Sequence, residues 1–142
     1  MTQVFLGGTC NNSQWREELK PLLNIDYFDP VVPNWNEAAQ AAEIAARENS
    51  EYCLYVITPK MTGVYSIAEI IDDSNKRPDK IIFAYTASDE GEEFSAHQLK
   101  SLKQVAKMVI GNGGEAFIDP ITDFATLAGI LNKPVVVKIA SN

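Results

Sequence analysis

The sequence predicts an α/β fold, in which a parallel β-sheet carries α-helices on both faces. Apolar runs of strand length alternate with longer segments of helical periodicity along the chain. The run at residues 52–58 is apolar without alternation, which is typical of a central parallel strand buried on both faces. Pro, Gly, Asn and Asp gather between these segments, where the turns are expected.

Length and composition fit a single domain over residues 1–142. A chain of 142 residues with 46% hydrophobic and 22% charged residues can bury a core without metals or disulfides. The net charge of −7 disfavours a surface that binds nucleic acid. A small molecule is therefore the expected partner, rather than a nucleic-acid polymer.

The chain opens with a strand and a helix. Residues 3–6 are a short apolar run, and Gly7-Gly8 ends the strand. Asn12 or Ser13 is expected to cap the helix that follows. Apolar side chains at helical spacing predict its buried stripe: Trp15, Leu19, Leu22 and Leu23.

A second strand and a second helix follow. Residues 25–28 form a strand that Asp29-Pro30 stops, and the segment up to residue 35 is a loop with two prolines. Asn36 is expected to cap an Ala-rich helix that runs to residue 49.

The middle of the chain supplies two more strands, at residues 52–58 and 80–85, and a helix at residues 64–75 between them. The helix is expected to bury a stripe of Val64, Ile67, Ala68 and Ile71. The adjacent face, by i+3/i+4 spacing, consists of Tyr65, Glu69, Asp72 and Lys76. The plain structural interpretation of that face is a solvated stripe with an Asp72–Lys76 pair.

The last third is predicted to contain an acidic loop, two helices and one or two strands. In order these are the loop 86–93, the helix 96–110, the strand 115–118 and the helix 123–131. A glycine-rich stretch from Gly111 stops the first of these helices. Residues 134–139 read as a further strand or as a tail that packs elsewhere.

Five strands separated by helices predict a flavodoxin-like three-layer sandwich with strand order 2-1-3-4-5 and right-handed crossovers. The order of the strands reverses between the first and the third, and ligands bind at such a switch point. The loops at residues 7–10 and 58–63 follow these two strands. We therefore expect the two loops to lie side by side and to form the ligand site.

The cysteines and the histidine do not suggest a metal site. Cys53 lies in an apolar run and is expected to be buried, whereas Cys10 follows a strand and is expected to be accessible. His97 is the single histidine, and no ligand spacing typical of zinc occurs. We expect no metal and no cofactor.

The chain is expected to be cytoplasmic. The apolar residues after Met1 are too few for the core of a signal peptide, and no apolar run has the length of a membrane span. A membrane partner is therefore not expected.

Glu69 is the candidate for chemistry, because it follows a strand and a Pro/Gly loop near the start of a helix. A carboxylate held there can act as a nucleophile or as a general base. Gly7-Gly8 would let a ligand approach the backbone closely. This loop is neither GxGxxG nor a P-loop, and a tight βα turn is its plain structural interpretation.

Three segments resemble the nucleoside 2-deoxyribosyltransferase-like family. They are VFLGGTCNNSQWREELKPLL at residues 4–23, YFDPVVPNW at 27–35 and ITPKMTGVYSIAEIIDDSNKRP at 57–78. Together they cover roughly the first 80 residues. The resemblance implies an enzyme that cleaves or exchanges the N-glycosidic bond of a 2-deoxynucleoside or its 5′-monophosphate. It also implies a homo-oligomer.

The resemblance carries family roles to particular positions. GVYSIAE is similar to the Gly-rich loop that leads to the family's nucleophilic glutamate, which implies that role for Glu69. Glu43 is the nearest counterpart of a family acid on the second helix, and Asp72 is a further candidate for the second acid. Where the family commonly has an aspartate and an aromatic hydroxyl, this chain has Gly63 and Phe5.

Groups at the strand ends and in the neighbouring loops are expected to hold the sugar and the base. They are Gly7, Gly8, Thr9, Asp29, Asn34, Trp35, Gly63, Tyr65 and Ser66. Trp35 could stack on a base or simply pack against the protein.

Two other functions fit the same fold. One is a non-catalytic nucleotide-binding module, which Gly63 and Phe5 favour. The other is a flavodoxin-like electron carrier, although the hydroxyl-rich phosphate loop that a flavin mononucleotide would need is not evident.

Overall fold

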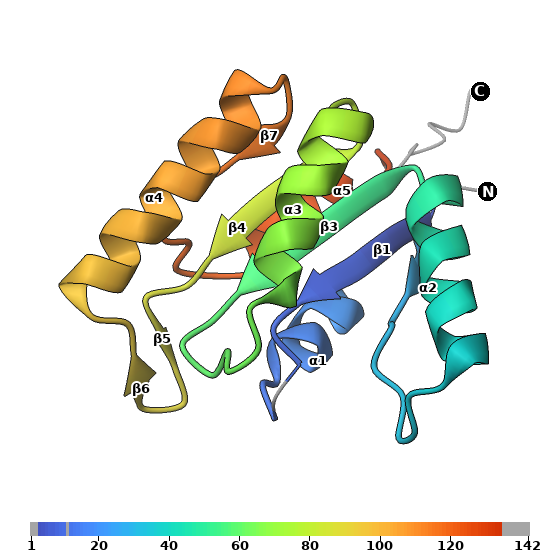
Figure 1. Ribbon diagram of the computed structural model, residues 1–142, viewed down its shortest axis with the longest axis horizontal. Helices are drawn as coiled ribbons and strands as arrows, with labels where there is room; N and C mark the ends of the chain where they lie inside the picture. Colours follow the sequence, from blue (N-terminus) through green and yellow to red (C-terminus); the bar gives the residue numbers. More distant parts are fainter. Residues whose placement is uncertain (1–2, 11, 135–142) are drawn as a thin grey trace, which may run out of the picture.

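The computed structural model describes residues 3–10 and 12–134 of the chain. Its main sheet is parallel throughout, with the strand order β2-β1-β3-β4-β7 (Figure 1). The strands are β1 (Gln3–Gly8), β2 (Asp26–Phe28), β3 (Tyr52–Ile57), β4 (Ile81–Tyr85) and β7 (Glu115–Ala116). The predicted α/β class and strand order are confirmed, since β7 takes the place of the fifth predicted strand.

Helices cover both faces of this sheet. The helices are α1 (Trp15–Leu19), the 3-10 turn η1 (Lys20–Leu22), α2 (Glu37–Asn49), α3 (Tyr65–Lys76), α4 (Ala96–Gly111) and α5 (Ala125–Leu131). Helices α2, α3 and α4 lie on the near face in Figure 1, and α1 and α5 lie behind the sheet. The fold is therefore a three-layer sandwich.

Each face of the sheet contributes to a separate hydrophobic cluster. Val4 and Leu6 of β1 pack with residues of α1 and α5, whereas Phe5 points to the other face, toward α3 and α4. All residues of β3 after Tyr52 are buried, because alternate side chains enter the two clusters. The expected burial of Cys53 is confirmed.

The expected acidic loop at residues 86–93 is instead a small hairpin of β5 (Ser88–Asp89) and β6 (Glu92–Glu93). Its two turn residues, Glu90 and Gly91, both have positive φ, at 47° and 88°. A type I′ hairpin turn requires this conformation, and glycine adopts it readily. The acidic composition of this segment indicated a loop, but the Glu90-Gly91 pair forms a hairpin turn.

The first helix is shorter than predicted and lacks the expected cap. Gln14 occupies the N-cap position without a side-chain hydrogen bond, and the Ser13 hydroxyl donates to Asp89 of the distant hairpin instead. Leu22 lies in η1 and is 45% exposed, so it is not part of the buried stripe. By contrast, Asn36 caps α2 as predicted, accepting a hydrogen bond from the Ala39 N–H.

The buried face of α3 differs from the predicted stripe. Val64 precedes the helix and is 69% exposed, and Ala68 is exposed. The buried positions are Glu69, Ile70, Asp73 and Ser74, while Ile67 and Ile71 are half-buried. Three of these four buried side chains are polar, and hydrophobic periodicity cannot predict the burial of polar side chains.

The prediction for residues 134–139 lies outside the described residues from position 135 onward. Across residues 3–10 and 12–134, none of the helices combines the length and the apolar character that crossing a bilayer requires.

Candidate active site

A pocket of about 410 Å³ opens at the carboxyl ends of β1 and β3, between the loops that follow these strands and helices α2 and α3. This is the switch point of the strand order, where open α/β sheets bind ligands. Its lining comprises Phe5, Gly7, Gly8, Thr9, Cys10, Arg16, Pro30, Val31, Val32, Trp35, Glu43, Met61, Gly63, Tyr65, Ser66 and Glu69.

Most residues singled out from the sequence lie in this lining, including Glu69, Glu43 and Trp35. Three of them lie outside it: Asp29, Asn34 and Asp72. The carboxylate of Asp29 accepts hydrogen bonds from Lys20 at 2.7 Å and from the Val31 N–H at 2.9 Å. Asp72 pairs with Lys76 and Arg47, and its side chain is 42% exposed.

The two loops meet as expected at Thr9. The Thr9 hydroxyl accepts a hydrogen bond from the Thr58 N–H at 2.9 Å, and the Thr9 N–H donates to the Val56 carbonyl at 3.0 Å. Gly8 has φ of +115°, and a Cβ there would overlap the Val56 carbonyl oxygen. Glycine is therefore required at position 8 by the neighbouring strand as well as by the loop conformation.

Gly63 has a different environment. A Cβ placed at Gly63 would have no heavy atom within 4 Å. The residue lines the pocket, so the absence of a side chain there enlarges the space open to a ligand.

Arg16 is a site residue that the sequence did not reveal. It is 4% exposed and donates from Nε to the Leu6 carbonyl at 3.0 Å, and from Nη1 to the Thr9 carbonyl at 2.7 Å. Burial lowers the pKa of Arg16 to about 10, and the nearby Asp29 carboxylate partly opposes this shift. Arg16 thus fixes the loop after β1. In the WREE segment it reads as an ordinary solvated helix residue.

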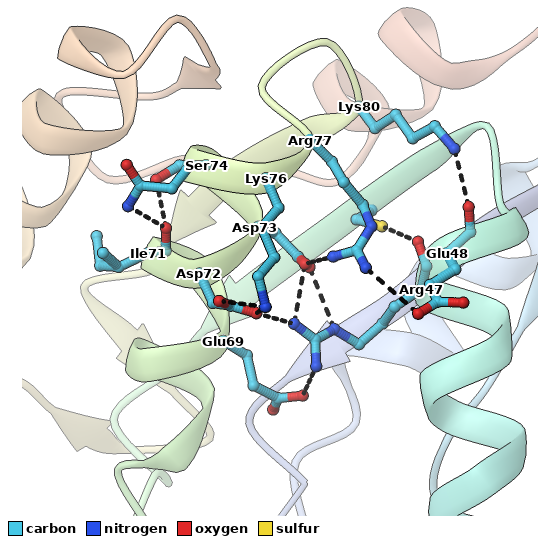
Figure 2. Close-up of polar contacts among 12 residues, drawn as sticks. Arg47, Glu48, Glu69, Ile71, Asp72, Asp73, Ser74, Lys76, Arg77 and Lys80 are labelled. Carbon is cyan, nitrogen blue, oxygen red and sulfur yellow. Dashed lines mark hydrogen bonds and ion pairs between the residues drawn. The ribbon is translucent and has the colours of Figure 1, made fainter.

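Glu69 lies on α3 in the wall of the pocket and is 8% exposed. Its Oε2 atom is 3.4 Å from Nη1 of Arg47 (Figure 2) and accepts no hydrogen bond from the residues that the structure describes. Burial raises the pKa of Glu69 to about 8, and the neighbouring Glu43 carboxyl adds to the shift. Arg47 acts in the opposite direction.

Glu43 reaches the same pocket from α2 and lies beside Glu69. Two carboxyl groups in one pocket repel each other when both are ionised, so the pair tends to retain a proton. The pair can therefore offer one ionised carboxylate and one protonated acid at the same time, which is the requirement for acid-assisted displacement.

Apolar side chains complete the pocket opposite the acids. Val31, Val32 and Trp35 come from the loop after β2, and Met61 comes from the loop after β3. Trp35 is 57% exposed and presents an aromatic surface at the mouth of the pocket. Such a wall suits a planar aromatic ligand, while the acids suit its polar part.

The two cysteines differ in their surroundings. Cys10 is exposed in the pocket lining, as expected. Burial raises the pKa of Cys53 to about 12, so its thiol is inert at neutral pH. Within the described part of the chain, no cluster of three His, Cys, Asp or Glu side chains could hold a metal ion.

The fold and the pocket define a flavodoxin-like α/β fold with a carboxylate-lined pocket at its switch point. The nucleoside 2-deoxyribosyltransferase-like family matches the chain over residues 1–86. This is more than half of the 142 residues, and the chain belongs to that family. No curated protein and no solved structure matches the chain.

Proposed function

We propose that this protein cleaves or exchanges the N-glycosidic bond of a 2-deoxynucleoside or its 5′-monophosphate, with Glu69 as the nucleophile. The observation that carries the proposal is the Glu43–Glu69 pair in a single pocket. The Oε2 atom of Glu69 accepts no hydrogen bond from the described residues, so a lone pair is available to a carbon electrophile. Membership of the family supports the same chemistry.

The pocket suits the two halves of such a substrate. The base stacks on Trp35 and lies against Val31 and Val32, which form the apolar wall. The deoxyribose lies between the Gly7-Gly8 backbone and Glu69, which line the same pocket.

In the first step, the Glu69 carboxylate attacks C1′ of the sugar and the bond from C1′ to the base nitrogen breaks. Glu43 gives its proton to the departing base as the bond electrons move onto that nitrogen. The product is an ester that links C1′ to Glu69, with the base released.

The two acids need opposite protonation states for this step. Burial and the neighbouring Glu43 carboxyl raise the pKa of Glu69 to about 8, so Glu69 holds a proton near neutral pH. For the attack this proton must pass from Glu69 to Glu43, and the positive charge of Arg47, 3.4 Å from Glu69, favours the ionised form of Glu69 that results.

In the second step, water or another base attacks C1′ and displaces Glu69, while Glu43 accepts the proton of the attacking group. Water makes the reaction a hydrolysis, and a second base makes it a transfer. Both outcomes retain the configuration at C1′, because two displacements occur in succession.

The test is base release from a panel of 2-deoxynucleosides and their 5′-monophosphates, with and without a second free base. We expect release or exchange that Glu69→Gln lowers by at least about 1,000-fold, since the nucleophile is lost. Glu37→Gln is the matched control, because Glu37 is an exposed acid at the start of α2, outside the pocket lining.

Asp72→Asn tests the other candidate for the second acid. Asp72 lies outside the pocket lining, so we expect Glu43→Gln to lower turnover more than Asp72→Asn does. The proposal would be contradicted if panel members bind to the protein but no turnover that depends on Glu69 is observed. That result would instead indicate the non-catalytic nucleotide-binding module.

A further inference from the structure

A buried group of charges joins α2 to α3 directly behind Glu69, as Figure 2 shows. Arg47 of α2 contacts both carboxylate oxygens of Asp73, from Nε at 3.3 Å and from Nη2 at 2.9 Å. The remaining guanidinium nitrogen, Nη1, faces Glu69 at 3.4 Å. A two-point contact of this kind fixes the plane of a guanidinium group, so Asp73 determines where Nη1 points.

Asp73 is itself held from two further sides. It is fully buried, its Oδ2 accepts a hydrogen bond from the Tyr55 hydroxyl of β3, and its Oδ1 contacts Arg77. Burial and the nearby Asp73 carboxylate raise the pKa of Tyr55, so the hydroxyl remains a neutral donor. The sheet thereby fixes Asp73, and Asp73 fixes Arg47.

The spacing along the two helices is the same. Arg47 follows Glu43 by four residues on α2, and Asp73 follows Glu69 by four residues on α3. Residues four apart lie on one face of a helix, about one turn from each other. The helices therefore meet in two layers, with the Glu43–Glu69 pair at the pocket and the Arg47–Asp73 pair one turn further along. The two carboxylates of the first layer repel each other when ionised, whereas the opposite charges of the second layer attract each other.

Helix α2 has little else to keep it in place. Ala46 is its single buried residue, so the apolar contribution to its packing is small. Its other contacts are polar. Lys80 Nζ donates to the Glu48 carbonyl at 3.0 Å on the exposed side, and the Cys53 thiol donates to the Arg47 carbonyl at 3.3 Å in a partly buried position. The position of Glu43 in the pocket therefore depends largely on the Arg47–Asp73 pair.

We propose that Arg47 and Asp73 are positioning residues that hold α2 against α3, so that Glu43 and Glu69 face the same ligand. In addition, the positive charge of Arg47 favours the ionised form of Glu69. This proposal rests on the proposed function for its catalytic consequence, but the arrangement of charges can be tested without any turnover.

Four charged or titratable groups face Glu69 from the elements around it. Glu43 and Arg47 come from α2, Tyr55 comes from β3, and Asp73 comes from α3 itself. Arg47 is the cation of this group. Its loss leaves Glu69 among acids alone, so the protonated form of Glu69 should become more favourable.

The first test is a pH titration of the Glu69 carboxyl carbon by ¹³C NMR on the full chain. We expect Arg47→Gln to raise the midpoint by about one pH unit or more. Arg77→Gln is the matched control, because it removes a cation from the same Asp73 carboxylate while Arg77 pairs with Asp73 and Glu48. An unchanged midpoint in Arg47→Gln, or an equal shift in both variants, would overturn the proposal.

The second test is a double-mutant cycle on stability, which needs no substrate. We expect Glu43→Gln to raise the urea midpoint more in the Arg47→Gln background than in the native chain at pH 8.5. At pH 5 this difference should disappear, because Glu69 is then protonated and no longer repels Glu43. An effect of Glu43→Gln that is equal in both backgrounds at pH 8.5 contradicts the two-layer arrangement.

The third test uses whichever substrate the panel identifies. Arg47→Lys retains the charge but not the two-point contact, and we expect kcat to fall about 100-fold with KM within about twofold. Normal kcat in Arg47→Lys and in Asp73→Asn would overturn the positioning role. If the native chain turns over nothing, the proposed function fails, while the titration and the cycle still decide the role of the Arg47–Asp73 pair.

Discussion

At the scale of single residues, the balance of burial and charge around Glu69 is the feature with the clearest consequence. Its carboxyl is 8% exposed, and both the loss of solvent and the adjacent Glu43 penalise its ionised form. One cation, Arg47, offsets part of this cost. A residue in such a position lowers the stability of the fold in exchange for reactivity, as functional sites commonly do.

We therefore predict that Glu69→Gln stabilises the protein at alkaline pH. Folding raises the pKa of Glu69 from 4.5 to about 8. Below pH 4.5 Glu69 is protonated in both the folded and the unfolded state. At higher pH it ionises first in the unfolded chain, so the free energy of unfolding falls until about pH 8. Urea denaturation at pH 9 should give the Glu69→Gln variant a free energy of unfolding about 2–4 kcal/mol higher than that of the native chain. The two proteins should be nearly equal at pH 4, and a less stable variant at pH 9 would contradict this account.

At the scale of elements, α2 differs from the other long helices because its stability comes from its ends and its charges. Its segment is rich in alanine, which favours helix, and the Asn36 side chain accepts from the Ala39 N–H at 2.8 Å. In α4, by comparison, Leu102, Ala106 and Val109 are buried in addition to a capping box at Ser95. A cap should therefore matter more to the local order of α2 than to that of α4.

Asn36→Ala is expected to remove about 1 kcal/mol from α2 and to speed hydrogen exchange of its amides selectively. Ser95→Ala, the matched change in α4, should lower global stability by a similar amount without selective exchange in its own helix. Hydrogen exchange followed by NMR measures both. Equal protection of α2 amides in Asn36→Ala and the native chain would show that the helix is held by packing instead.

At the scale of the whole molecule, the region that matches the family is not a complete folding unit. Among the described residues, all those that line the pocket lie within residues 1–86. The core, however, needs the rest of the chain. Helix α4 covers one face of the sheet, and Leu127, Ala128 and Leu131 of α5 are buried in the cluster on the other face. The pocket therefore lies in the part of the chain that matches the family, whereas both hydrophobic clusters extend beyond it.

A fragment of residues 1–86 is accordingly predicted not to fold cooperatively. Without α4 and α5, Phe83, Val56 and their buried neighbours would face water on both sides of the sheet. Urea unfolding followed by circular dichroism should give a broad transition for the fragment and a single steep one for the full chain. A steep transition for the fragment would show that residues 87–142 are dispensable for folding.

Local patterns were sufficient for much of this structure. Apolar runs without alternation predicted the central strands, Asn36 predicted a cap, and the position of Glu69 after a strand and a loop predicted its place in the pocket. These features depend on residues that are close together in the chain, so hydrophobic periodicity and the residues typical of turns and caps are enough to predict them. The switch-point rule then placed the two loops side by side.

The sequence by itself determined the α/β class, the strand order and the acid that faces the pocket. Only the tertiary structure decided that Arg16 supports the loop after β1 and that Asp73 is fully buried. A charge can be buried only where partners satisfy it, and the partners of Asp73 include Tyr55 on β3 and Arg47 on α2. Contacts between residues so far apart in the chain form only when the sheet and helices assemble.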